Sequence, residues 1–93
     1  MIQTFSYRTE TSNNNYRHTI HSADIMSSVE KWLNRIEELH DKVYSFDKIQ
    51  VENIRTQFLN NQFQIHFEKE PYFLTYKADN RIQVVYIDKV KTG

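Results

Sequence analysis

Residues 25–43 read IMSSVEKWLNRIEELHDKV, and this stretch decides the fold. Apolar residues recur in it at steps of three and four positions, namely Ile25, Val29, Trp32, Leu33, Ile36, Leu39 and Val43. This spacing places them on one stripe of an α-helix. We expect Ser22 or Asp24 to cap the helix and residues 40–42 to end it. A helix with one apolar stripe requires a second layer of structure to pack against.

Alternating polar and apolar residues flank this helix on both sides. Before it, residues 3–9 and 16–20 predict a β-hairpin with a polar, Asn-rich loop between the strands. After it, residues 63–67, 72–77 and 82–90 predict three strands joined by short turns. Residues 82–90 are apolar at odd and even positions alike. We therefore expect that strand either to lie centrally in a sheet or to be covered by a partner.

Residues 43–61 fit two templates equally well. One is a helix with Asp47 as its N-cap, and the other is a strand that ends in a hairpin turn. We favour the strand slightly, because Asn60 and Asn61 tolerate the left-handed backbone that a two-residue turn requires. The expected fold class is α+β, with one antiparallel sheet of about four to five strands and one amphipathic helix across a face. The element order is β-β-α-(β or α)-β-β-β.

Length and composition set further limits. The 93 residues predict a single domain, residues 1–93. Twelve basic and twelve acidic side chains balance, which removes a general attraction to nucleic acid or anionic lipid. The chain has no cysteine, no apolar run long enough to span a membrane and no signal-peptide pattern, so we expect a cytoplasmic protein. Residues with AT-rich codons are abundant, which indicates a phage, a mobile element or a low-GC bacterium as the source.

The motifs of catalysis and metal binding are missing from the sequence. The four histidines, His18, His21, His40 and His66, do not have the spacing of a metal site. The one glycine is the last residue, so the chain has no glycine-rich phosphate loop and no G-x-S-x-G elbow. Glu37 and Glu38 are helix neighbours that point apart. We expect no metal, no cofactor and no enzymatic activity.

The C-terminal strands offer the best candidate surface. Aromatic and basic side chains alternate there, and the candidate binding residues are Tyr72, Tyr76, Lys77, Arg81 and Tyr86. Tyr and Arg are enriched at the centres of protein interfaces. The leading hypothesis is therefore a small protein-binding module, used as an inhibitor or adaptor, and a homodimer is left open. The alternative is a nucleic-acid-binding regulator that uses an aromatic sheet face, and a small enzyme is third.

Overall fold

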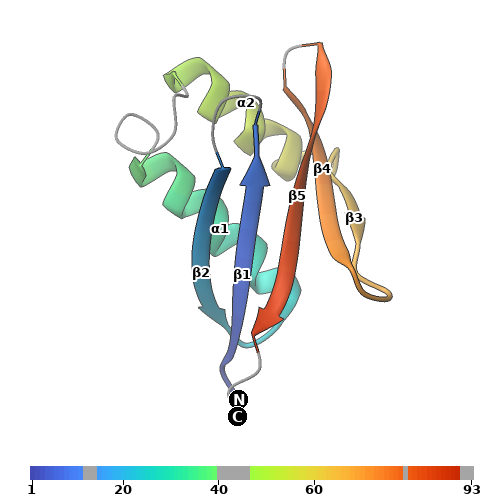
Figure 1. Cartoon of the computed structure of the whole chain (residues 1–93). Coiled ribbons are helices and arrows are strands. Elements are labelled where there is room, and N and C mark those ends of the chain that lie inside the picture. Colours follow the sequence, from blue (N-terminus) through green and yellow to red (C-terminus); the bar gives the residue numbers. More distant parts are fainter. Residues whose placement is uncertain (12–14, 40–46, 79, 91–93) are drawn as a thin grey trace.

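The computed structural model describes residues 1–11, 15–39, 47–78 and 80–90. Over these residues the elements are β1 (Gln3–Glu10), β2 (Asn15–Ser22), α1 (Ile25–Leu39), α2 (Lys48–Leu59), β3 (Gln64–His66), β4 (Tyr72–Ala78) and β5 (Arg81–Val90). The strands form one antiparallel sheet, and α1 and α2 lie on the same side of it (Figure 1). We call the side without these helices the open face. The predicted α+β class is confirmed, with a second helix between residues 43 and 61.

The sheet has the strand order β2-β1-β5-β4-β3. β1 and β5, from opposite ends of the chain, therefore pair along their length, with Thr4 opposite Val90 and Tyr7 opposite Ile87. β5 is the central strand of the five. This is one of the two explanations expected for its apolar residues on both faces, the other being coverage by a partner.

The core lies between the sheet and the helices. Phe5 and Tyr7 share the helix-covered face of β1, as the alternation predicts, and the positions opposite and beside them on β2 are Tyr16, His18 and Ile20. Trp32 of α1 is 0% exposed, and its ring stacks on that of Tyr7 with 5.4 Å between the ring centroids. The strongest sequence signal for a helix therefore coincides with the centre of the core.

The N-terminus of α1 is capped by Asp24. Its Oδ1 atom accepts a hydrogen bond from the backbone N–H of Ser27 at 2.7 Å, which decides between the two expected caps. Ser22 is instead a buried residue at the end of β2. The expected end of the helix at residues 40–42 lies outside the described residues, as does Val43.

The preference for a strand within residues 43–61 is wrong, because Lys48–Leu59 forms α2. Asp47 and Gln50 form a reciprocal capping box. The Asp47 carboxylate accepts from the Gln50 backbone N–H at 2.8 Å, and the Gln50 side-chain oxygen accepts from the Asp47 backbone N–H at 2.8 Å. Two N–H groups that the first turn of a helix leaves unpaired are thereby satisfied.

Asn61 does adopt the left-handed backbone on which the strand hypothesis relied, with a φ of 55°. It uses this conformation to end α2 rather than to turn a hairpin. The backbone N–H of Gln62 donates to the carbonyl of Gln57 at 2.8 Å, and that of Asn61 donates to Phe58 at 3.1 Å. This pair of bonds is the Schellman motif, in which Asn is an accepted substitute for Gly.

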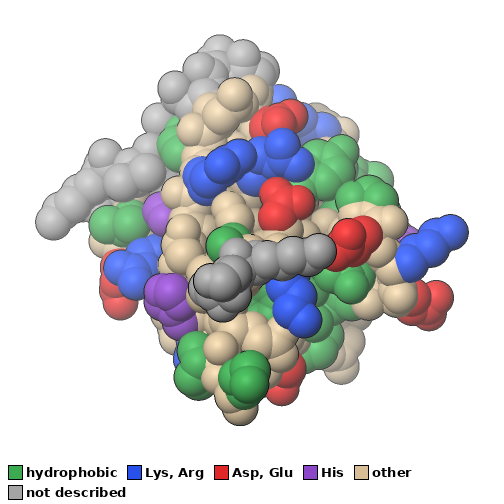
Figure 2. Space-filling model, turned by 60° about the horizontal axis from the view of Figure 1, so that its bottom comes forward, with side chains coloured by type: hydrophobic (Ala, Val, Ile, Leu, Met, Phe, Trp, Pro, Cys, Tyr) green, Lys and Arg blue, Asp and Glu red, His purple; other side chains and the backbone are tan. Residues whose placement is uncertain are grey.

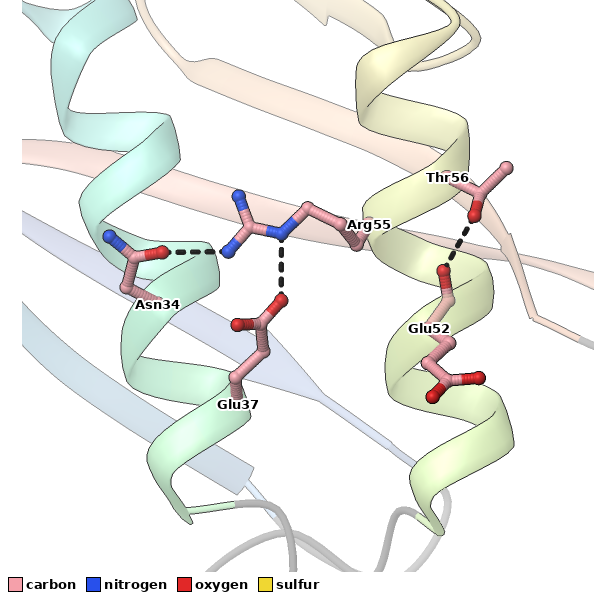
Figure 3. Close-up of polar contacts among 5 residues, drawn as sticks. All are labelled: Asn34, Glu37, Glu52, Arg55 and Thr56. Atoms are coloured by element: carbon pink, nitrogen blue, oxygen red, sulfur yellow. Dashed lines mark hydrogen bonds and ion pairs between the residues drawn. The ribbon is translucent and has the colours of Figure 1, made fainter.

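The two helices are joined by one side chain of α2. Arg55 donates to Glu37 through Nε and to Asn34 through Nη2, each at 2.7 Å, and Figure 3 shows it reaching across to α1. On the opposite side, α2 is held to the sheet by Gln57, whose amide pairs with both the backbone N–H and the carbonyl of Lys77. Neither described helix has the length and hydropathy needed to cross a membrane.

Candidate functional site

The register of β4 and β5 separates the five predicted binding residues. Tyr72 and Tyr76 point to the helix-covered side of the sheet, whereas Lys77 and Tyr86 project from the open face. Arg81 lies opposite Ala78 at the end of the hairpin, on the helix side. The five residues therefore do not form one surface, because side chains an odd number of positions apart along a strand point to opposite faces.

Tyr76 is a core residue. It is 2% exposed, and its ring contacts those of Phe63 and Trp32, with centroid separations of 5.6 and 6.4 Å. Burial raises the pKa of its hydroxyl, while the positive charge of Arg81 acts in the opposite direction. Tyr72 is half-buried and meets the ring of Phe67 edge-on at 6.4 Å. The Tyr76 ring is therefore not available to a partner, and that of Tyr72 is only partly so.

The open face carries a line of three rings and one guanidinium that crosses four strands. Tyr86 of β5 lies opposite Arg8 of β1 on one side and opposite Phe73 of β4 on the other, and Phe73 lies opposite His66 of β3. The Arg8 guanidinium is 5.2 Å from the centroid of the Tyr86 ring, and the Phe73 and His66 rings stack at 4.4 Å with an angle of 18° between their planes. We call Arg8, Tyr86, Phe73 and His66 the ring row.

An apolar surface runs along β5 across this row. Ile82, Val84, Tyr86 and Val90 share the open face of that strand, and Phe73 adjoins them from β4. Ile82 is 66% exposed, and no helix among the described residues covers any of the five. We call Phe73, Ile82, Val84 and Tyr86 the open-face patch. The solvent face of an antiparallel sheet is normally polar, so an exposed apolar patch there indicates a binding surface.

Charged groups border the patch. Arg8 is 3.9 Å from the Asp88 carboxylate, and Arg17 of β2 lies directly opposite Arg8. Like charges in directly opposed positions destabilise a strand pair, and a carboxylate from a partner would offset that repulsion. Figure 2 shows hydrophobic side chains next to both basic and acidic ones, without one sign of charge dominating that view.

Three of the predicted residues meet at a second place. A pocket of about 60 Å³ lies between the first half of α2 and the end of the β4–β5 hairpin, and its lining includes Tyr76, Lys77 and Arg81 together with Gln50 and Asn53. We call it the end pocket. The sequence suggested these tyrosine and basic residues as a stacking surface, but the fold assembles them around a cavity.

Sequence reasoning did not assign to the site the open-face residues Arg8, His66, Phe73, Ile82 and Val84 or the pocket residues Gln50 and Asn53. Arg8 and His66 are far from β5 in the sequence and join it only through strand pairing, so no local pattern marks them. Within the described ranges, no three His, Asp or Glu side chains are grouped as a metal site.

Comparison of the chain with protein-family models, with curated proteins and with solved structures found no match. The functional argument therefore depends on the geometry of the open face and the end pocket.

Proposed function

We propose that this chain is a small non-enzymatic protein-binding module whose binding surface is the open-face patch. The observation that carries the proposal is the apolar open face of the central strand, which no described helix covers. The partner surface would be apolar at its centre, to cover Ile82, Val84 and Tyr86, and would present carboxylates to Arg8 and Arg17. An apolar, aromatic centre with a charged rim is the usual anatomy of a protein interface.

A single-stranded nucleic acid is the second candidate, and the ring row is the observation that favours it. Bases bind sheet surfaces by stacking on free ring faces. Phe73 and His66, however, stack on each other, and the Arg8 guanidinium lies over Tyr86. These contacts occupy ring faces that a base would need. The balanced charge of the chain also favours the protein partner over the nucleic acid.

For the location and the biological role of the protein, we keep the proposal made from the sequence. We propose that the module acts in the cytoplasm as an inhibitor or adaptor, because a small domain without catalytic motifs affects other proteins by occupying their surfaces. A second copy of the chain is one partner that this surface would accept.

The test is affinity capture from the native cell after nuclease treatment, with two matched variants. Ile82→Ser alters the open-face patch, and Ile49→Ser alters a comparably exposed isoleucine on α2, since the two side chains are 66% and 78% exposed. We expect the wild type and Ile49→Ser to retain the same protein, and Ile82→Ser to lose it. Equal retention by both variants would remove the open face from the proposal.

A second variant separates the two candidate partners. Tyr86→Ala should weaken binding of a protein by about 2 kcal/mol or more, with a mild dependence on salt, as at an aromatic interface centre. A nucleic-acid ligand would instead give a steep salt dependence, and Lys77→Ala and Arg17→Ala would then matter as much as Tyr86→Ala. Isothermal titration at two salt concentrations gives both the change in binding free energy and its dependence on salt.

A further inference from the structure

The end pocket is formed by residues that the sheet register brings together. Tyr76 lies opposite Gln83, and Ala78 lies opposite Arg81, so all four belong to the helix side of the β4–β5 hairpin. α2 closes the pocket with Gln50, Asn53 and Ile54. Its volume of about 60 Å³ exceeds the roughly 10–15 Å³ that a single water needs, so it can hold a small polar group.

The described residues leave several hydrogen-bond donors free at this pocket and one evident acceptor, the Gln83 side-chain oxygen, because the Gln83 amide nitrogen donates to two backbone carbonyls. The Gln50 side-chain oxygen is engaged by the Asp47 backbone N–H at 2.8 Å, and the Asn53 side-chain oxygen accepts a long bond from Gln57 at 3.4 Å. These bonds leave the NH₂ groups of Gln50 and Asn53 as donors without a hydrogen-bond partner among the described residues.

Tyr76 and Arg81 add stronger donors. Tyr76 is only 2% exposed, and its hydroxyl makes no hydrogen bond to a described residue. The hydroxyl oxygen keeps some contact with solvent. Arg81 is permanently charged and lies close enough for its charge to act on that hydroxyl. None of the described residues that line the pocket is acidic. The site therefore combines a fixed positive charge with an unpartnered hydroxyl and two amides.

We infer that the end pocket binds a carboxylate group, with the Arg81 guanidinium and the Tyr76 hydroxyl as its main donors. A carboxylate accepts hydrogen bonds from both its oxygens and pairs with arginine in a planar arrangement. It suits the small volume, and its single charge matches one guanidinium better than the double charge of phosphate does. The group could belong to a free carboxylic acid or to an acidic side chain or C-terminus of a protein. This site is distinct from the open-face patch and does not depend on it.

The test is a titration of the intact ¹⁵N-labelled chain, followed by amide chemical shifts. Sodium acetate is added against sodium chloride at the same ionic strength, and sodium phosphate is the third probe. We expect saturable shifts with acetate at Arg81 and at the side-chain NH₂ groups of Gln50 and Asn53, and none with chloride. Shifts that follow ionic strength alone, or tighter binding of phosphate than of acetate, would overturn the inference.

Three variants assign the binding to the pocket. Tyr76→Phe removes only a hydroxyl without a described partner, and Arg81 is exposed, so Tyr76→Phe and Arg81→Gln should both fold. Each should weaken acetate binding about tenfold or more, since hydrogen bonds to charged groups contribute at that level. Lys69→Gln makes the same charge change at an exposed position between β3 and β4 and should leave the affinity unchanged. Equal affinities in all three variants would place the acetate site elsewhere and refute the inference.

Two short peptides distinguish the source of the carboxylate. Tighter binding of a peptide with a free C-terminus than of acetate, with no binding of its C-terminal amide, would support a protein ligand. Equal binding of acetate and the free peptide would support a small acid. Ile82→Ser should leave both titrations unchanged, so failure of this inference and failure of the proposed function give different results.

Discussion

α1 and α2 lie side by side on one face of the sheet but are held there by different interactions. α1 buries Val29, Trp32, Leu33 and Ile36, and Trp32 stacks on Tyr7 in the core. α2 buries Val51, Ile54 and Gln57, and the last of these contacts the sheet through hydrogen bonds to the backbone of Lys77. The comparison teaches that α1 is positioned mainly by its apolar stripe, whereas α2, which buries fewer apolar residues, also depends on the hydrogen bonds of Gln57 to the sheet.

The largest effect should come from the centre of the α1 interface. Trp32→Ala should lower the free energy of unfolding by about 3–5 kcal/mol, because it removes a fully buried ring and leaves a cavity. Chemical denaturation measures this loss. Trp32→Phe is the control and should lose much less, since the indole N–H has no partner among the described residues. A Trp32→Ala protein as stable as the control would show that α1 is not anchored by this ring.

Loss of the Gln57 hydrogen bonds that hold α2 to the sheet should have the next largest effect on stability. Gln57→Ala leaves the backbone N–H and carbonyl of Lys77 without their partner, so we expect a loss of about 1–3 kcal/mol in the free energy of unfolding. Thr56→Ala is the control, because Thr56 is exposed and bonds only to the Glu52 carbonyl within its own helix (Figure 3). Equal stability of the two variants would mean that α2 is held by its apolar residues after all.

The capping box of α2 should contribute less to the free energy of unfolding than the Gln57 hydrogen bonds do. Asp47→Ala removes the carboxylate that accepts from Gln50, and we expect a cost of about 0.5–2 kcal/mol, in the usual range for an N-cap. Helix content by circular dichroism and the denaturation midpoint should fall together. Lys48→Ala is the matched neighbour, and a cost as large as that of Asp47→Ala would argue against a specific capping effect.

The contact between the helices should have the smallest effect. Arg55→Gln breaks the ion pair with Glu37, whose side chain is 42% exposed, so solvent screening limits the expected loss to about 0.2–1 kcal/mol. The difference from wild type should shrink at high salt. A double-mutant cycle with Glu37→Gln isolates the pair, and a coupling that salt does not change would contradict an electrostatic origin.

The same contrast explains which parts of the fold could be predicted from the sequence. The stripe of α1 and the alternation of the five strands are local patterns, and both are confirmed. α2 was ambiguous because its third buried residue is Gln57, and because Asn61 takes a left-handed backbone that serves a helix end as well as a hairpin. A local pattern does not reveal which of these uses the tertiary contacts select.

The candidate site was less predictable than the fold. Residue type alone grouped Tyr72 and Tyr76 with Tyr86, although they point to the other side of the sheet. Strand pairing brings Arg8 and His66 into the ring row, and helix packing brings Gln50 and Asn53 to the end pocket. These contacts depend on the strand order and on the position of α2, which the sequence left undetermined.

The pairing of β1 with β5 has a consequence for the synthesis of the protein. β1 leaves the ribosome before its partner at the centre of the sheet, Arg81–Val90, because the helices and the other strands lie between them along the chain. Until then β1 can pair only with β2, and the edge that β5 will occupy stays exposed. The loop between Glu10 and Arg81 must close before the sheet is complete, and closing so long a loop is a slow step in folding. The nascent chain thus carries an unpaired strand edge, which can pair with another chain and so promote aggregation until β5 covers it.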